Sequence, residues 1–333
     1  MDRWMSDTSR DHQPSAPRRA CALISAEHAE PLHAHAPPKP VAWLLLEDPG
    51  PWGEVAAARS ARVAQPIRAA AAERGLRLQL IRRHGGHAPE GRTCYLAWSA
   101  YDLGWIERRR LARLEDVLDA DLDALAAGRR PGFGEPVTAP VFLVCTHGKV
   151  DACCAQFGHP AARALTAAFG EAVWQTSHVG GCRFAANLVC LPHGIYYGRL
   201  TPEAAVRAAA AYADGRIAVD AYRGRAGAPQ AVQAAEYHVR RQEGLTGIDD
   251  LSLVTHQRLA DGRDEVCFHA GPYAYQVQVR LEPHGAPRAH GCGSDKRWIP
   301  DAYRLLHLHR TGVRPEPAGR SRWRATRATG DRP

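Results

Sequence analysis

The sequence predicts an α/β protein, on the strength of three observations. Short apolar runs with the length of buried strands alternate with stretches whose apolar residues follow helical spacing. Clusters of Gly and Pro separate these segments. Apolar residues make up 45% of the 333 positions and charged residues 23%, with no apolar run long enough to cross a membrane. A chain of this length can bury a sizeable core and predicts two domains.

The first half opens with a buried strand at Val41–Glu47, and turn-forming residues follow it at Asp48–Gly53. An Ala-rich helix interrupted by Pro66 is expected next. The remaining predicted elements of this half are strands at Leu76–Ile81 and Thr93–Trp98 and a helix at Glu107–Ala127. The Ala-rich helix that contains Pro66 is expected to extend from Glu54 to Arg74 and to end at Gly75.

The second half begins with a strand at Pro140–Val144, which leads directly into a loop at Cys145–Ala155. Pro160 suits the first turn of a helix from about His159 to Phe169. The elements expected after it are a strand at Ala172–Thr176, a tight turn at His178–Cys182, a hairpin of Ala185–Leu191 with Ile195–Leu200, helices at Thr201–Ala213 and Pro229–Arg241, a hairpin of Val266–His269 with Ala274–Leu281, and a strand at Tyr303–His309.

The Gly/Pro-rich segment Gly128–Pro140 is the best domain boundary in the sequence. We therefore expect an N-terminal α/β domain at 21–135 and a second domain with a C-terminal extension at 136–310. Residues 1–20 form a polar leader without the apolar core of a secretory signal, and residues 311–333 form a basic, Arg-rich tail. Both ends are expected to be disordered. His33 and His35 lie in a Pro-rich segment and are expected to be exposed.

Nine cysteines are too unevenly spaced for a disulfide scaffold, and an odd number leaves one unpaired. Without an export signal the chain is expected to be cytoplasmic, and its clustered cysteines are expected to be metal or redox ligands. The scattered ones are interpreted as small buried residues: Cys21, Cys94, Cys190 and Cys267.

One cluster carries chemistry: Cys145, Cys153, Cys154, His178 and Cys182 lie within 38 residues. Thiolates with imidazole select zinc or iron–sulfur clusters over hard cations. The eight residues between Cys145 and Cys154 form a wider gap than structural zinc sites use, and they suit a loop around a larger inorganic core. A thioredoxin-type thiol enzyme would need Cys-x-x-Cys before a helix, which this cluster lacks.

Between Cys21 and His309 the chain resembles the sucrase/ferredoxin-like proteins. The specific motifs are Cys145-Thr-His-Gly-Lys-Val-Asp-Ala-Cys-Cys154 and His178-Val-Gly-Gly-Cys-Arg-Phe184. Weaker matches are Glu47–Gly53, Leu191-Pro192, Tyr197–Arg199, Tyr222–Arg225 and Gln233–Glu236. The resemblance implies a thioredoxin-like domain that binds a [2Fe–2S] cluster through Cys145, Cys154 and His178.

The fourth ligand differs from the family pattern, because bis-histidinyl members have His-x-Gly-Gly-His where this chain has Cys182. Cysteine is an equally good iron ligand, so three thiolates and one imidazole are expected to hold the cluster. The added negative charge resists reduction. We expect a potential between the Rieske range, about −150 to +300 mV, and the plant-type value near about −400 mV, with one proton-coupled step.

Neighbouring residues leave alternatives open. Cys153 competes with Cys154 for one ligand position, although the family spacing favours Cys154. His147 is a substitute ligand or, more plausibly, a hydrogen-bond donor beside the ligands. Gly180 and Gly181 are expected to let the backbone approach the cluster, and Arg183 to offset its charge. Cys292 matches a family cysteine near the C-terminus, and its role stays open.

These residues predict a [2Fe–2S] electron carrier, more plausibly a non-enzymatic protein than an enzyme. The alternatives are a thiol-dependent oxidoreductase that uses Cys153 and Cys154, and a zinc-stabilised interaction module. No pair of carboxylates suggests a glycosidase, and no Gly-rich loop suggests nicotinamide binding. The expected partner is an unidentified redox protein, with no nucleic acid and no membrane.

Overall fold

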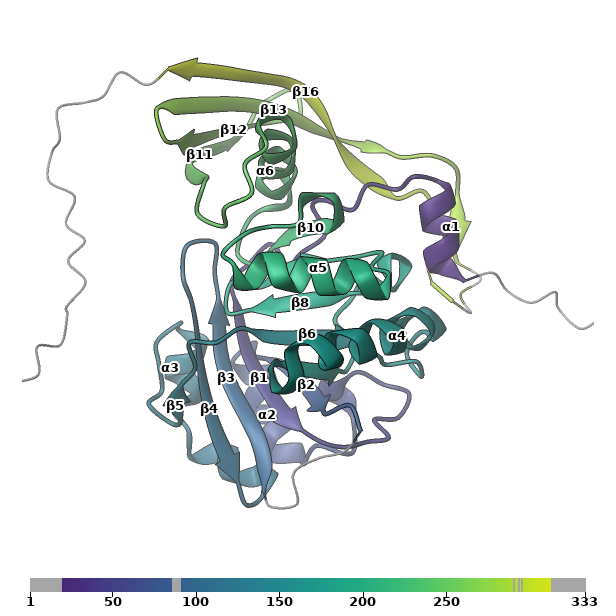
Figure 1. Ribbon diagram of the computed structural model, residues 1–333, viewed down its shortest axis with the longest axis vertical. Coiled ribbons are helices and arrows are strands. Elements are labelled where there is room, and N and C mark those ends of the chain that lie inside the picture. Colours follow the sequence, from purple (N-terminus) through teal and green to yellow (C-terminus); the bar gives the residue numbers. More distant parts are fainter. Residues whose placement is uncertain (1–19, 86–90, 290, 293, 295, 313–333) are drawn as a thin grey trace, which may run out of the picture.

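The computed structural model describes residues 20–85, 91–289, 291–292, 294 and 296–312. It is a mixed helix and strand structure built on a large curled sheet, which confirms the α/β class (Figure 1). The expectations for the leader 1–20 and the tail 311–333 fall almost wholly outside the described residues. No helix in the described ranges is long and apolar enough to cross a membrane.

The ten strands of the large sheet lie in the order β10-β9-β8-β6-β7-β2-β1-β3-β4-β5. The first half contributes β1 (Val41–Glu47), β2 (Arg77–Arg82), β3 (Arg92–Ser99), β4 (Gly104–Leu111) and β5 (Glu135–Pro136), with helices α2 (Gln65–Glu73) and α3 (Leu122–Ala126). The second half contributes β6 (Val141–Cys145), β7 (Val173–Thr176), β8 (Leu188–Leu191), β9 (Ile195–Tyr197) and β10 (Tyr222–Arg225), with helices α4 (Ala152–Phe169) and α5 (Pro202–Ala213).

The two halves repeat one topology. In the first half β1 pairs with β2 in parallel and with β3 antiparallel, and β3 pairs antiparallel with β4. In the second half β6 pairs in the same way with β7 and β8, and β8 with β9. A helix connects the parallel strands each time. This βαβ unit followed by an antiparallel hairpin and a helix is the thioredoxin-like order that the resemblance implies, and it occurs twice.

The halves join where β2 pairs antiparallel with β7, at Ile81 with Thr176 and Arg82 with Gln175. The sheet therefore continues across the boundary expected near residue 135, and the division into two domains stays a prediction.

Both faces of the sheet are buried, which explains the continuous apolar runs of β1 and β6. Phe142 and Val144 of β6 face α4 and α5, and Leu44 and Leu46 of β1 face α2 and α3. The intervening residues of both halves meet in one shared core, which includes Trp43, Leu45, Leu143, Cys145 and Trp174. Cys145, at the end of β6, therefore lies in this shared core.

A second sheet covers one end of the molecule. Its strands are β11 (Ser252–Arg258), β12 (Arg263–Ala270), β13 (Tyr273–Pro283) and β16 (Asp301–Gly312), and α6 (Gln230–Glu243) packs against them. The short strands β14 (Arg288–Ala289) and β15 (Arg297–Trp298) pair with each other. Figure 1 shows α1 (Cys21–Glu27) beside the segment that contains these two short strands. Cys21 contacts Cys292 of that segment and Cys153 at the start of α4.

Several helix predictions are wrong in their bounds. The helix expected from His159 begins at Ala152, because the Asp151 carboxylate caps its first turn, and Pro160 lies inside it. The helix expected over Glu54–Arg74 is limited to α2, where Pro66 stands in the first turn rather than interrupting it. The second half of the chain otherwise follows the expected order, with α5 and α6 close to their predicted ranges.

The helix predicted over Glu107–Ala127 is wrong. Residues up to Leu111 belong to β4, and the rest form a 3-10 helix, η2 (Leu114–Asp119), and the short α3. Pairing with β3 along eight residues outweighs the helical spacing of the leucines. The elements α1, β10 and β11 were not predicted. His33 is buried rather than exposed, and His35 is half-buried.

Candidate metal centre

Three consecutive features of the second half position the predicted ligands. Cys145 is the last residue of β6, and the chain turns through Thr146–Val150 before α4 begins. The Asp151 side chain accepts a hydrogen bond from the Cys153 backbone N–H at 3.0 Å and so fixes the helix start. Cys154 thereby lies in the first turn of α4, where the helix N-terminus favours a thiolate.

The other two ligands come from the tight turn after β7. Gly180 and Gly181 have φ angles of +92° and +71°, a region that favours glycine. A Cβ atom on Gly181 would also meet the Arg223 guanidinium. The glycines reverse the chain within four residues, which returns Cys182 to the side of His178.

The structure brings these side chains together. The donor atoms of Cys145, Cys154 and His178 all lie within 4.8 Å of one another, and Cys182 lies within the same limit of Cys154. The Cys182 Sγ is 3.6 Å from His178 Nδ1, and the Cys154 Sγ is 3.9 Å from the same nitrogen. All four predicted ligands therefore form one continuous group, the Cys145 group.

Exposure across the Cys145 group is uneven. Cys145 and Cys154 are each only 1% exposed, whereas His178 and Cys182 are half-buried. A metal held here would have one edge inside the shared core and one edge toward solvent.

The four side chains of the Cys145 group shift one another's pKa values in opposite directions. Hydrogen bonding to Cys154 lowers the pKa of Cys145 well below its ordinary value, and it lowers the pKa of Cys182 to about 7. The same hydrogen bonds, with Cys145 first and Cys182 second, raise the pKa of Cys154. Burial alone would lower the pKa of His178, but the adjacent Cys145 and Cys182 thiolates raise it to about 10. Two thiols therefore lose their protons readily, as metal ligands must.

His147 orients His178 rather than joining the donors. Its Nε2 lies 2.8 Å from the Gly53 carbonyl oxygen, which can only accept, so that nitrogen carries the proton. Its Nδ1 accepts a hydrogen bond from the His178 backbone N–H at 3.3 Å. The Trp52 ring packs edge-on against the imidazole at 5.7 Å. The turn after β1 in the first half thus supports His178, a predicted ligand in the second half.

Arg183 lies beside the group but is paired elsewhere. Its Nε donates to the buried Glu30 carboxylate at 2.6 Å, and Arg288 lies 3.2 Å from the other oxygen of Glu30. Arg223 instead holds the turn, because it donates to Asn187 at 2.7 Å and to the Gly180 carbonyl at 3.5 Å. Sequence reasoning missed Arg223, although it lies in the Tyr222–Arg225 motif.

The two adjacent cysteines of α4 separate. Cys154 lies with Cys145 and His178, whereas Cys153 lies with Cys21, Asp151 and Cys292. These four form a second group, the Cys153 group. An Asp151 oxygen also lies within 4.8 Å of the Cys154 and Cys182 sulfurs, so this carboxylate borders both groups of thiols. Cys21 was expected only to pack, and no local motif marks it. Its nearest thiols belong to residues 132 and 271 positions away in the chain.

Comparison with known proteins gives one match. The model of the family described as sucrase/ferredoxin-like matches residues 40–224, more than half of the chain, and this range contains the whole Cys145 group. No curated protein and no solved structure matches the chain.

Proposed function

The chain belongs to the sucrase/ferredoxin-like family, and on that premise we propose that it binds a [2Fe–2S] cluster and carries electrons. The proposed ligands are Cys145, Cys154, His178 and Cys182. Gly180, Gly181 and Arg183 border the same site.

The observation that carries this proposal is the convergence of all four side chains from a strand end, a helix start and a glycine turn. Their sequence spacing alone does not require such proximity. Three soft thiolates and an imidazole suit iron–sulfur chemistry. Cys145 and Cys182 fall into different compact sets of donors, which share Cys154.

A bound cluster would supply reversible one-electron chemistry. The residues of this chain would bind it, orient it and limit its contact with water. Cys145 and Cys154 anchor it in the core, His147 fixes the His178 backbone, and Asp151 fixes the start of α4. Arg223 holds the turn that carries Cys182.

The half-buried edge formed by His178 and Cys182 is the proposed exit for the electron. The proposed partner is a redox protein that docks on this edge. A cytoplasmic location agrees with cysteines that have to stay reduced to act as ligands.

Anaerobic purification of the full chain tests the function. We expect a coloured protein that dithionite bleaches, with two irons and two acid-labile sulfides per chain as the cluster formula requires, and an EPR signal from the reduced form. Cys145→Ser and Cys154→Ser should each remove most of the visible absorption.

Cys94→Ser is the matched control, because Cys94 is equally buried but lies on β3 of the first half. Its spectrum should equal that of the unaltered chain. Protein that holds neither iron nor sulfide, or that holds only zinc at Cys145, would exclude the electron-carrier function.

A further inference from the structure

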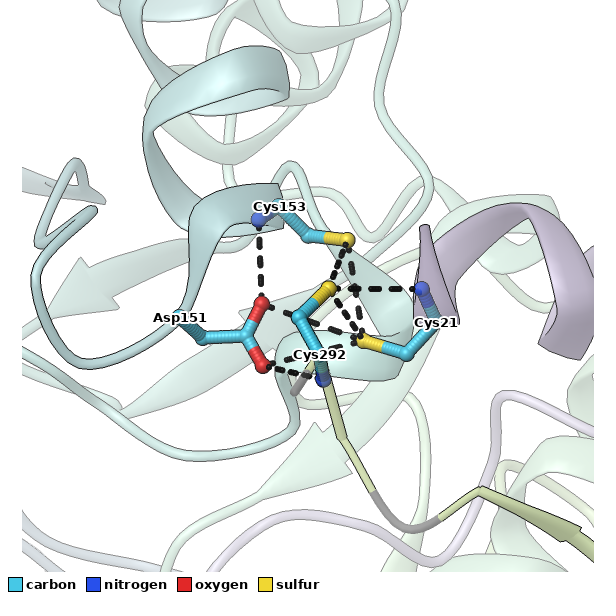
Figure 2. A group of neighbouring side chains, drawn as sticks. All are labelled: Cys21, Asp151, Cys153 and Cys292. Atoms are coloured by element: carbon cyan, nitrogen blue, oxygen red, sulfur yellow. Dashed lines mark hydrogen bonds between the residues drawn. The ribbon is translucent and has the colours of Figure 1, made fainter. Parts of the chain in front are cut away.

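We propose that the Cys153 group is a second metal site, distinct from the first, in which Cys21, Cys153, Cys292 and Asp151 hold a single tetrahedral ion of the Zn²⁺ class. Figure 2 shows the three thiols and the carboxylate pointing toward one another from three separate segments. These segments are α1, the start of α4 and the loop between β14 and β15.

The donors are packed more tightly than those of the Cys145 group. The Sγ–Sγ distances are 3.6 Å for Cys21 and Cys153, 3.2 Å for Cys153 and Cys292, and 3.5 Å for Cys292 and Cys21. Both Asp151 oxygens lie 3.8 Å from the Cys21 Sγ. All four donor atoms are within 4.8 Å of one another.

These distances match one ion. Zn–S bonds of about 2.3 Å place two sulfurs on the same tetrahedral ion about 3.8 Å apart. The three sulfurs need only a small outward movement to reach that separation. Three thiolates and one carboxylate form a donor set that a borderline-soft dication accepts.

Backbone N–H groups around the Cys153 group hold the Asp151 carboxylate and the Cys292 thiol in place. The Cys292 N–H donates to an Asp151 oxygen at 3.1 Å, and the Cys153 N–H donates to the other at 3.0 Å. The Cys21 N–H points to the Cys292 Sγ at 3.4 Å. Each carboxylate oxygen keeps a further lone pair for a metal, and N–H donation to sulfur stabilises a thiolate.

The site is closed rather than open to a substrate. Cys21, Cys153 and Asp151 are buried, and Cys292 is half-buried. Closed four-ligand sites in proteins are structural. A metal here would join residues 21, 153 and 292 and hold α1 and the segment around Cys292 against α4. Among the residues that the structure describes, no extended sheet pairing connects these segments.

Metal analysis of the full chain, purified anaerobically from medium that contains iron and zinc, tests this site. We expect about one zinc per chain in addition to the iron. Cys21→Ser and Cys292→Ser should each weaken Zn²⁺ binding by more than about 100-fold in a chelator competition, while iron and visible absorption stay unchanged. Cys292 lies at the partly exposed side of the group, so this variant keeps the test valid if Cys21→Ser fails to fold.

Two controls separate this site from the first. Cys267→Ser, at a half-buried cysteine on β12, should leave both metals in place. Cys145→Ser should remove iron and sulfide but keep the zinc, in protein whose circular dichroism is unchanged. The proposal is overturned if the unaltered chain contains no zinc, or if Cys21→Ser and Cys292→Ser both retain it. It is also overturned if well-folded Cys145→Ser loses its zinc, or if the anaerobic protein contains a disulfide between Cys153 and Cys292.

Discussion

Cys182 is the residue that distinguishes this chain from the His-x-Gly-Gly-His pattern, and its charge gives a direct test. Replacing Cys182 by His removes one negative charge from the proposed ligand set. The oxidised cluster is then less strongly favoured over the reduced cluster. The midpoint potential of Cys182→His should rise by on the order of 100 mV or more. Potentiometric titration followed by visible absorption would measure this change.

The reverse substitution is the matched control. His178→Cys adds a negative charge and should lower the potential. A fall in potential for Cys182→His, or no shift in either variant, would exclude these two residues as ligands.

A buried ion-pair network around Glu236 stabilises the packing of α6 against β10. Glu236 and Arg240 of α6 are fully buried, with 2.9 Å between their charged atoms, and Arg225 lies 3.7 Å from the same carboxylate. Tyr222 donates to the other Glu236 oxygen at 3.1 Å. Two of the family-like motifs in the sequence therefore meet in this network.

Glu236→Gln should destabilise the protein by about 3–5 kcal/mol, because it leaves two buried guanidinium groups without their carboxylate. Urea unfolding followed by circular dichroism would measure the loss. The control is Asp220→Asn, since Asp220 pairs with Arg241 in an exposed position and should cost less than about 1 kcal/mol. Equal losses in the two variants would contradict the role of burial.

At the scale of the element, the position of α4 determines the distance between Cys145 and Cys154, two of the proposed ligands. Gly158 lies in the N-terminal half of α4, and a Cβ there would overlap the Cys145 carbonyl oxygen. The absence of a side chain allows α4 to approach the end of β6 closely, which brings the first-turn Cys154 next to Cys145.

Gly158→Ala should therefore destabilise the protein by about 1–3 kcal/mol, although alanine is normally the better helix former. Separation of α4 from β6 should also lower the iron content. Thermal unfolding and iron analysis would test both effects. Arg163→Ala, at an exposed position of the same helix, should change stability by less than about 0.5 kcal/mol. A Gly158→Ala protein as stable as the unaltered chain would contradict the close approach.

The elements also show what the sequence could predict. Buried strands such as β1 and β6 were predictable because their apolar runs are short and bounded by turn residues. The start of α4 was not predictable in the same way. Cys153 and Cys154 were assigned to a ligand loop, because nothing in the local pattern identified Asp151 as the N-cap of the helix. The strand β4 was missed because Leu111 at its end continues the helical spacing of the leucines that follow it, and only pairing with β3 decides its structure.

The site was predictable to the extent that its spacing is local. Cys145, Cys154, His178 and Cys182 lie within one continuous stretch and were nominated together. Cys21 was interpreted as a packing residue because its neighbours in space are distant in sequence. No local pattern could have linked it with Cys292.

At the scale of the whole molecule, the N-terminal segment is held by a buried histidine. The His33 ring stacks on Tyr237 of α6 at 4.4 Å, lies 5.0 Å from the His238 ring and is 3.3 Å from the Tyr303 carbonyl oxygen of β16. Burial lowers the pKa of His33 to about 4.

Because the unfolded chain binds this proton near pH 6.5 and the folded chain only near pH 4, the stability due to neutral His33 is complete above pH 6.5. It is lost as the pH falls toward 4, up to about 3 kcal/mol. The stability advantage of the unaltered chain over His33→Gln should therefore shrink between pH 6.5 and 4 and stay constant between pH 7 and 8. Urea unfolding across this range would test it, and a constant difference at all pH values would contradict it.

The pairing of β2 with β7 has a consequence for dissecting the protein. Each of these strands covers the edge of the other, and the two halves bury Trp43, Leu45, Leu143 and Trp174 in a common interior. A fragment cut near residue 135 would expose both an unpaired strand and a broad apolar surface, which are the features that lead to aggregation. Expression of 136–312 by itself should yield insoluble material, so cofactor studies require the intact polypeptide.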